Sequence, residues 1–175
     1  KDKIQIREYR NVLLTSKNAV DHYFRMCEDM RVLISADTRY FCISEAIAYY
    51  LQKYVVYRKR KIYHGNLTIE ELIPTLKKFK NEKFLMPSSD TLKPSIPNAL
   101  EEAGIEYKRA ILFNTVVSDL SDLEDVTYDI LVFFSPSGIK SLYKNFPEFK
   151  QKNTRLACFG SSTQKEAESM GLVVD

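Results

Sequence analysis

Short β-rich runs alternate with helix-forming segments along the whole chain, and this alternation limits the folds that the chain can adopt. Alternation of this kind gives a parallel sheet, because each helix carries the chain back to the start of the next strand. The sequence therefore predicts an α/β fold. The predicted strands are residues 11–14, 39–43, 54–57, 83–86, 107–117, 129–134, 155–159 and 172–174.

Helix start and stop signals lie between these runs. Ser16 precedes apolar residues at helical spacing, which predicts an N-cap. Thr68 and Glu71 have the spacing of a capping box, and Pro74 is expected to kink the helix that follows. Gly104 is expected to end the helix that begins near residue 94.

The chain also repeats itself. The first copy reads NVLLTSKNAVDHYF and then DTRYFCISEAIAYYLQKYVV, and the second reads DILVFFSPSGIKSLY and then NTRLACFGSSTQKEAESMGLVV. The apolar pairs before Thr15 and Ser135 correspond at an offset of 120, and Cys42 corresponds to Cys158 at an offset of 116. We therefore expect two similar parallel-sheet units, of which the second begins near Asp129 and repeats only part of the first.

The composition argues against several classes of protein. Three widely spaced cysteines and two histidines, none at ligand spacing, predict no metal site and no disulfide. No apolar run approaches the ~20 residues of a membrane span, and the chain has neither a Walker loop nor a GxGxxG motif. We expect a cytoplasmic monomer that needs no cofactor and does not contact a membrane.

The densest basic run is Arg58-Lys59-Arg60-Lys61, which tyrosines flank on both sides. Basic residues interleaved with aromatic rings are typical of single-stranded nucleic-acid binding. They are equally typical of an edge strand that charge protects from pairing with other chains. The net charge of +3 is low, so we favour the edge strand and expect no nucleic-acid partner.

Serine and threonine recur where predicted strands end and helices begin. In an open parallel sheet these turns lie at the carboxyl edge, where ligands bind, and helix N-termini there favour anions. Plain helix capping accounts for any one of them, but their recurrence in both repeats favours an anion site. The candidate ligand-binding residues are Thr15, Ser16, Ser44, Ser88, Ser89, Ser135, Ser137, Ser162 and Thr163.

Several segments taken together resemble the uroporphyrinogen-III synthase family. The match is strongest over FFSPSG, residues 133–138, and continues in the apolar pair before Thr15 and in the turn from Gly160 to Thr163. PSSD at 87–90, ALEEAG at 99–104 and LFNTV at 112–116 also resemble family segments. Phe113 stands where the family has a tyrosine that is often proposed as a proton donor, so no catalytic residue is assigned.

The resemblance implies two α/β domains of flavodoxin-like type, joined by a two-stranded linker, with the substrate in the cleft between them. It implies a complete domain over residues 8–111, a linker strand over 112–116 and a partial second domain over 117–175. A strand–helix unit before the first linker and a last helix, both present in the family, have no counterpart in this sequence.

The resemblance also implies a reaction, the cyclisation of hydroxymethylbilane to uroporphyrinogen III with inversion of ring D and loss of water. The alternative from another class is a non-catalytic paralogue that binds a tetrapyrrole or another polyanion in the interdomain cleft. A third reading is an unrelated two-domain module that binds a small anion.

Overall fold

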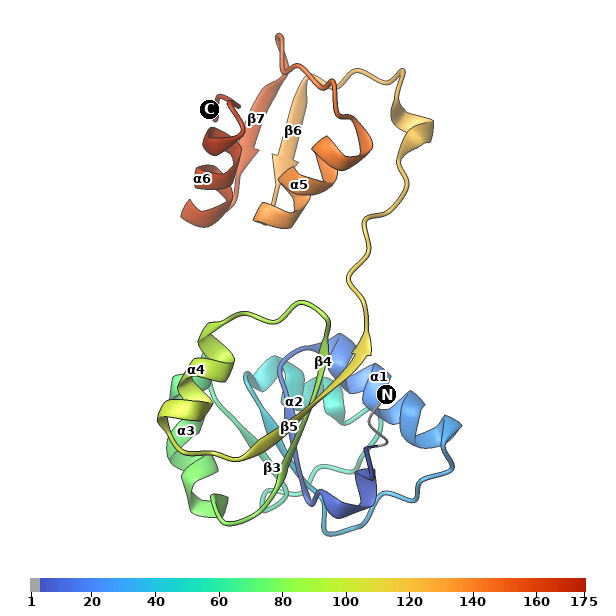
Figure 1. Cartoon of the computed structure of the whole chain (residues 1–175), viewed down its shortest axis with the longest axis vertical. Coiled ribbons are helices and arrows are strands. Elements are labelled where there is room, and N and C mark those ends of the chain that lie inside the picture. Colours follow the sequence, from blue (N-terminus) through green and yellow to red (C-terminus); the bar gives the residue numbers. More distant parts are fainter. Residues whose placement is uncertain (1–3) are drawn as a thin grey trace. The chain divides into compact units, whose positions relative to one another are not determined.

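The computed structural model describes residues 4–175, and the chain divides into two compact units. The first unit ends at Thr115 and the second begins at Val116. Figure 1 shows a larger unit with a sheet between helices and a smaller unit in which strands and helices also pack together. Each unit is described separately.

The larger unit is built on a five-stranded sheet in which all neighbouring strands are parallel, so the predicted α/β class is confirmed. Flavodoxin-like proteins have the strand order 2-1-3-4-5, whereas this sheet has the order β3-β2-β1-β4-β5. The strands are β1 (Asn11–Leu14), β2 (Arg39–Cys42), β3 (Ile62–His64), β4 (Phe84–Ser89) and β5 (Tyr107–Phe113).

Helices cover both faces of this sheet, because side chains alternate along each strand. Val12 and Leu14 of β1 pack in one core with α1 (Lys17–Asp29) and α2 (Glu45–Leu51). Leu13 packs on the opposite face in a second core with α3 (Ile69–Leu76) and α4 (Ser95–Glu102). Figure 1 shows the same division, with α1 on one side of the sheet and α3 and α4 on the other.

Local signals act where the sequence predicts them. Ser16 Oγ accepts a hydrogen bond from the Ala19 backbone N–H at 3.1 Å and so caps α1. The capping box of Thr68 and Glu71 begins α3, and the helix gives way to a 3-10 turn, Lys77–Phe79, soon after Pro74. Gly104 follows α4 with a φ of +65°, a left-handed conformation that suits glycine at a helix end.

Two of the predicted strands are wrong. Residues 54–57 form no strand, because the turn after α2 continues to Tyr54, where the N–H groups of Tyr54 and Val55 donate to the Leu51 carbonyl and the Tyr54 ring stacks on Phe24. Residues 172–174 form no strand, because the Gln151 side chain bonds both the N–H and the carbonyl of Val173, each at 2.8 Å. A side-chain amide therefore replaces a neighbouring strand there.

The strand predicted over residues 107–117 is shorter than expected. β5 ends at Phe113, because its partner β4 ends at Ser89 and leaves the later residues with no strand to pair with. The Asp90 carboxylate accepts the next hydrogen bond instead, from the Thr115 N–H at 2.8 Å. The basic run 58–61 forms the turn that enters β3, an edge strand, and Lys61 pairs with Asp37 there.

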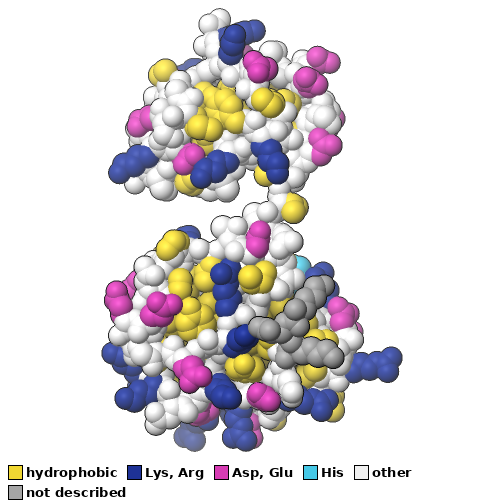
Figure 2. Space-filling view, in the orientation of Figure 1, with side chains coloured by type: hydrophobic (Ala, Val, Ile, Leu, Met, Phe, Trp, Pro, Cys, Tyr) yellow, Lys and Arg dark blue, Asp and Glu magenta, His cyan; other side chains and the backbone are white. Residues whose placement is uncertain are grey.

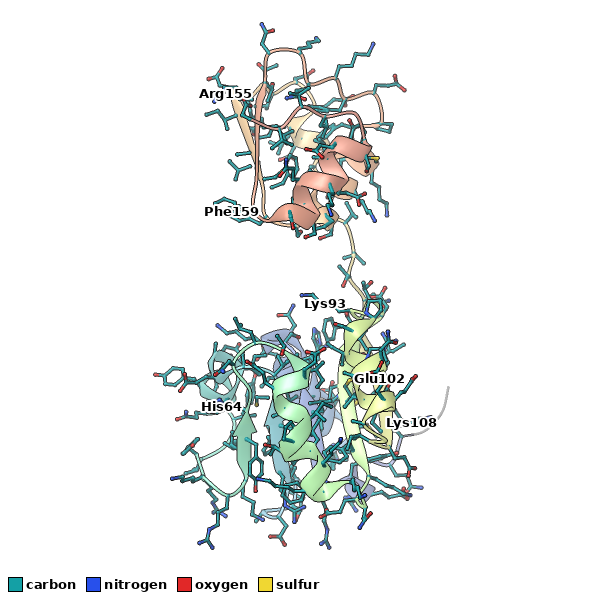
Figure 3. All side chains as sticks on the ribbon, turned by 90° about the vertical axis from the view of Figure 1, so that its left-hand side faces the viewer. His64, Lys93, Glu102, Lys108, Arg155 and Phe159 are labelled. Carbon is teal, nitrogen blue, oxygen red and sulfur yellow. The ribbon has the colours of Figure 1, made fainter. Side chains whose placement is uncertain are left out.

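The smaller unit has a two-stranded parallel sheet, and two helices cover one of its faces. Its core contains Ile139, Leu156, Ala167 and Leu172. On the opposite face Ile130 and Val132 are exposed. Figure 3 shows Phe159 pointing away from the helices, and Figure 2 shows further hydrophobic side chains on the surface of this unit. The elements are the 3-10 turn Ser121–Leu123, β6 (Ile130–Phe133), α5 (Pro136–Asn145), β7 (Arg155–Cys158) and α6 (Ser161–Ser169).

The repeat seen in the sequence is visible in the elements of the two units. β2 and β7 correspond at an offset of 116, and so do the N-caps of the helices after them, Ser44 and Gly160. The N-caps after β1 and β6 are Ser16 and Ser135, an offset of 119 rather than the 120 of the apolar pairs.

Candidate functional site at the carboxyl edges of the sheets

The carboxyl edge of the larger sheet has its topological switch between β1 and β4. From β1 the chain proceeds outward to β2, and from β4 it proceeds outward to β5 on the other side. In open α/β sheets a ligand binds where the order reverses in this way. Thr15 and Ser16 follow β1, and Ser88 and Ser89 are the last two residues of β4, so four predicted site residues lie at the ends of adjacent strands.

The hydroxyl groups along this edge are not equivalent. Ser16 is committed to capping α1, whereas the hydroxyls of Thr15 and Ser44 form no hydrogen bond with another residue in the part that the structure describes. Ser44 is nevertheless buried, at 7% exposure. A ligand at this edge therefore meets the half-buried Thr15 hydroxyl and the N-terminal turn of α1 more readily than it meets Ser44.

A hydrogen-bond network joins the end of β4 and the loop that follows it to Arg109 of β5. Ser88 Oγ donates to the Ser89 carbonyl at 3.0 Å and accepts from Arg109 Nε at 2.9 Å, and Ser89 Oγ donates to the Thr91 carbonyl. Arg109 Nη2 donates to the carbonyls of Ser89 and Asp90, both at 2.8 Å. Hydrogen bonds from the N–H groups of Thr115 and Thr91 lower the pKa of Asp90, which favours its charged form.

Arg109 organises this edge of the sheet through three hydrogen bonds, and the sequence did not single it out. Its strand reads YKRAILF, and the only signal is a pair of charged residues, Lys108 and Arg109, just before the apolar run of β5. Charged residues are common on an edge strand, so this signal does not distinguish a residue that binds a loop from one that faces water.

Phe113, at the end of β5, packs on a histidine. Its ring stacks on His22 of α1 with 4.3 Å between ring centroids and an interplanar angle of 13°. His22 Nδ1 accepts a hydrogen bond from Arg25 Nη2 at 2.7 Å, and this bond requires an unprotonated Nδ1. Phe113 has no proton to give, and it holds a histidine near this end of the strand.

We expect His22 to titrate below the usual pKa of about 6.5, because burial and then the Arg25 charge oppose its protonation. Since the folded-state pKa is the lower one, the unfolded chain binds the proton more tightly, and stability falls as the pH drops below about 6.5. A ¹H–¹³C NMR titration measures this pKa. Arg25→Gln should raise it part of the way, and a value at or above that of an unfolded peptide would contradict the packing described.

The smaller unit carries the remaining predicted site residues. The hydroxyls of Ser135 and Ser137 bond each other at 2.8 Å at the start of α5. At the start of α6, Ser162 is exposed and Thr163 is buried at 1% exposure. A ligand would therefore reach Ser162 before Thr163. Contact between substrate and any of these residues stays a prediction.

Residues 4–175 contain neither a candidate metal cluster nor a candidate membrane span. There, no three side chains of histidine, cysteine, aspartate or glutamate gather in a way that could hold a metal ion. No helix in the described part is long and apolar enough to cross a membrane.

Parallel α/β units with polar turns at the carboxyl edges of their sheets define a class of ligand-binding α/β proteins. Within this class, the family model described as uroporphyrinogen-III synthase HemD matches residues 1–175, and the chain belongs to that family. The predicted membership of a lyase family of tetrapyrrole biosynthesis is thereby confirmed. No curated protein sequence matches the chain significantly.

Solved structures are similar in fold. The uroporphyrinogen-III synthetase of Helicobacter pylori is 22% identical with a TM-score of 0.70, and the match covers 99% of this chain and 79% of that one. The wild-type uroporphyrinogen III synthase of Thermus thermophilus is 14% identical with a TM-score of 0.55, covering 96% and 70%. At these identities the likeness shows the fold.

Proposed function

We propose that this protein converts hydroxymethylbilane into uroporphyrinogen III. The substrate loses water to give a reactive azafulvene, ring D inverts through a spiro intermediate, and the macrocycle closes. The observation that carries the proposal is the match of the family model over the whole chain. The carboxyl edge supports it, because the N-terminal turn of α1 and the Thr15 hydroxyl suit carboxylates.

The demands of this reaction agree with such an edge. Hydroxymethylbilane is flexible and carries eight carboxylates, and correct ring inversion requires that it be held in one geometry. Orientation alone supplies as much as ~7–11 kcal/mol of a barrier in well-placed reactions. We propose that Thr15, Ser16, Ser44, Ser88 and Ser89 form or order the binding surface of one unit, and that Ser135, Ser137, Ser162 and Thr163 do so in the other.

A second candidate function is the binding of a tetrapyrrole without catalysis. The Phe113 ring favours it, because a phenyl group cannot protonate the departing hydroxyl. General acid assistance is usually worth ~10²–10⁴-fold in rate. If the reaction needs such an acid, it comes from another side chain, from water or from the substrate's own carboxylates.

We expect the protein to yield the type III isomer when it is incubated with freshly made hydroxymethylbilane and the isomers are separated by chromatography. The spontaneous reaction gives the type I isomer, so the isomer ratio reports the enzyme directly. Heat-denatured protein is the control. If only type I forms while the protein still quenches the fluorescence of uroporphyrin, the binding function replaces the catalytic one.

A further inference from the structure

The predicted substrate contacts Ser88 and Ser89 end β4, next to the β4–α4 loop, and the structure shows which group receives the hydrogen of each hydroxyl. A serine hydroxyl has one hydrogen to donate. Ser88 gives its hydrogen to the Ser89 carbonyl, and Ser89 gives its hydrogen to the Thr91 carbonyl. A carboxylate only accepts hydrogen bonds. Neither serine can therefore donate one to a carboxylate without breaking the bond that its hydroxyl already makes.

Arg109, which bonds the same loop, has N–H donors that remain available for a ligand. A guanidinium has five N–H donors, and three of them bond Ser88 Oγ and the carbonyls of Ser89 and Asp90. The two on Nη1 bond no residue in the described part of the chain. Arg109 is half-buried, and no acidic side chain pairs with it within residues 4–175.

We propose that Arg109, rather than Ser88 or Ser89, binds a substrate carboxylate at the β4–α4 loop, and that the serines position its guanidinium. The proposal rests on the proposed function for the identity of the polycarboxylate. Bonds from Nε and Nη2 fix the planar group, so Nη1 can meet an anion with little loss of freedom. Lys93, labelled in Figure 3, adds an exposed positive charge to the same loop.

Substitutions at Arg109 separate the effect of the hydrogen bonds that position the guanidinium from the effect of its charge. Arg109→Ala should weaken uroporphyrin binding, measured by fluorescence quenching, at least about tenfold, the usual effect of losing a hydrogen bond to a charged group. Arg109→Lys should weaken uroporphyrin binding nearly as much, because an ammonium group cannot form these three hydrogen bonds and also reach the ligand. Ser89→Ala should weaken uroporphyrin binding clearly less than Arg109→Ala does, because the Ser89 hydroxyl bonds the Thr91 carbonyl and alanine keeps the backbone carbonyl that Arg109 bonds.

Arg39 provides the matched control at the amino ends of the strands of the same sheet. It is also half-buried, and it pairs with Glu82 at 2.8 Å and bonds Asn11. Arg39→Ala should lower the melting temperature and leave uroporphyrin binding unchanged. This comparison separates loss of an anion contact from a general loss of stability.

A second readout does not depend on the tetrapyrrole. In ¹⁵N-labelled wild-type protein, citrate and uroporphyrin should each shift the Arg109 Nε–H NMR signal. A shift with citrate but no binding of uroporphyrin would overturn the proposed function and keep the carboxylate site. The inference is overturned if neither anion moves the signal, if Arg109→Ala binds uroporphyrin normally, or if Ser89→Ala is as weak as Arg109→Ala.

Discussion

Replacing Phe41 with alanine is expected to lower the free energy of unfolding of the larger unit by about 3–5 kcal/mol. Phe41 lies in β2 and is fully buried. Its ring packs on Tyr63, Phe79 and Phe84, with 5.1–5.4 Å between ring centroids. Removing it leaves a cavity between three rings that belong to separate segments and cannot all move inward.

Hydrogen exchange of the β1 and β2 amides measures this loss, because these central amides exchange only when the unit opens. The matched control is Tyr49→Ala, which removes an aromatic ring that is 76% exposed and should change stability by no more than about 0.5 kcal/mol. A loss below about 1 kcal/mol for Phe41→Ala would mean that the rings refill the space and that the core is less tightly packed than described.

The strands around Phe41 illustrate what the sequence can predict. β1, β2 and β4 are apolar runs bounded by polar turns, and burial on both faces of the sheet gives that pattern directly. Ser16, the capping box at Thr68 and Gly104 act through their immediate neighbours, so their effects are visible in a short window of sequence. For these features, local chemistry decides the structure.

The segment after α2 shows where local pattern fails. Its apolar and aromatic residues at 54–57 have the composition of a strand, yet the strand is the three-residue β3, which begins at Ile62. Tyr54 is held by Phe24 and Asp21 of α1, residues about thirty positions earlier in the chain. A contact at that separation leaves no local signature, and neither does the strand order of the sheet.

In the candidate site, too, local features could be predicted from the sequence and long-range contacts could not. The polar turns at the strand ends follow from the strand–helix pattern, so the predicted hydroxyl residues could be placed at the carboxyl edges. The Ser16 partner is local and could be predicted, but a partner that comes from another element could not. Ser88 accepts a hydrogen bond from a guanidinium of β5, and Ser44, the N-cap of α2, is buried. A hydroxyl residue in the sequence therefore indicates a strand end, but its hydrogen-bond partners in the fold decide whether the hydroxyl is available to a ligand.

Gly160→Ala is expected to destabilise the smaller unit by about 1–3 kcal/mol, the usual cost of a non-glycine residue in a region of backbone angles that glycine alone occupies readily. Gly160 is the N-cap of α6, with a φ of +84° and a ψ of +148°. An added Cβ would meet no atom within 4 Å, so the cost comes from the backbone conformation itself. A unit whose core has four buried apolar residues has little stability to lose.

Exchange of the β6 and β7 amides should therefore speed up in Gly160→Ala, while exchange in β1 and β2 stays as in the wild type. Ser161→Ala, one residue later on the exposed first turn of α6, is the control and should change neither. Unchanged protection of β6 and β7 in Gly160→Ala would show that this turn adopts other backbone angles in solution. Because Gly160 sets the direction of the first turn of α6, the same variant should also displace Ser162 and Thr163, which would weaken any anion held at that helix start.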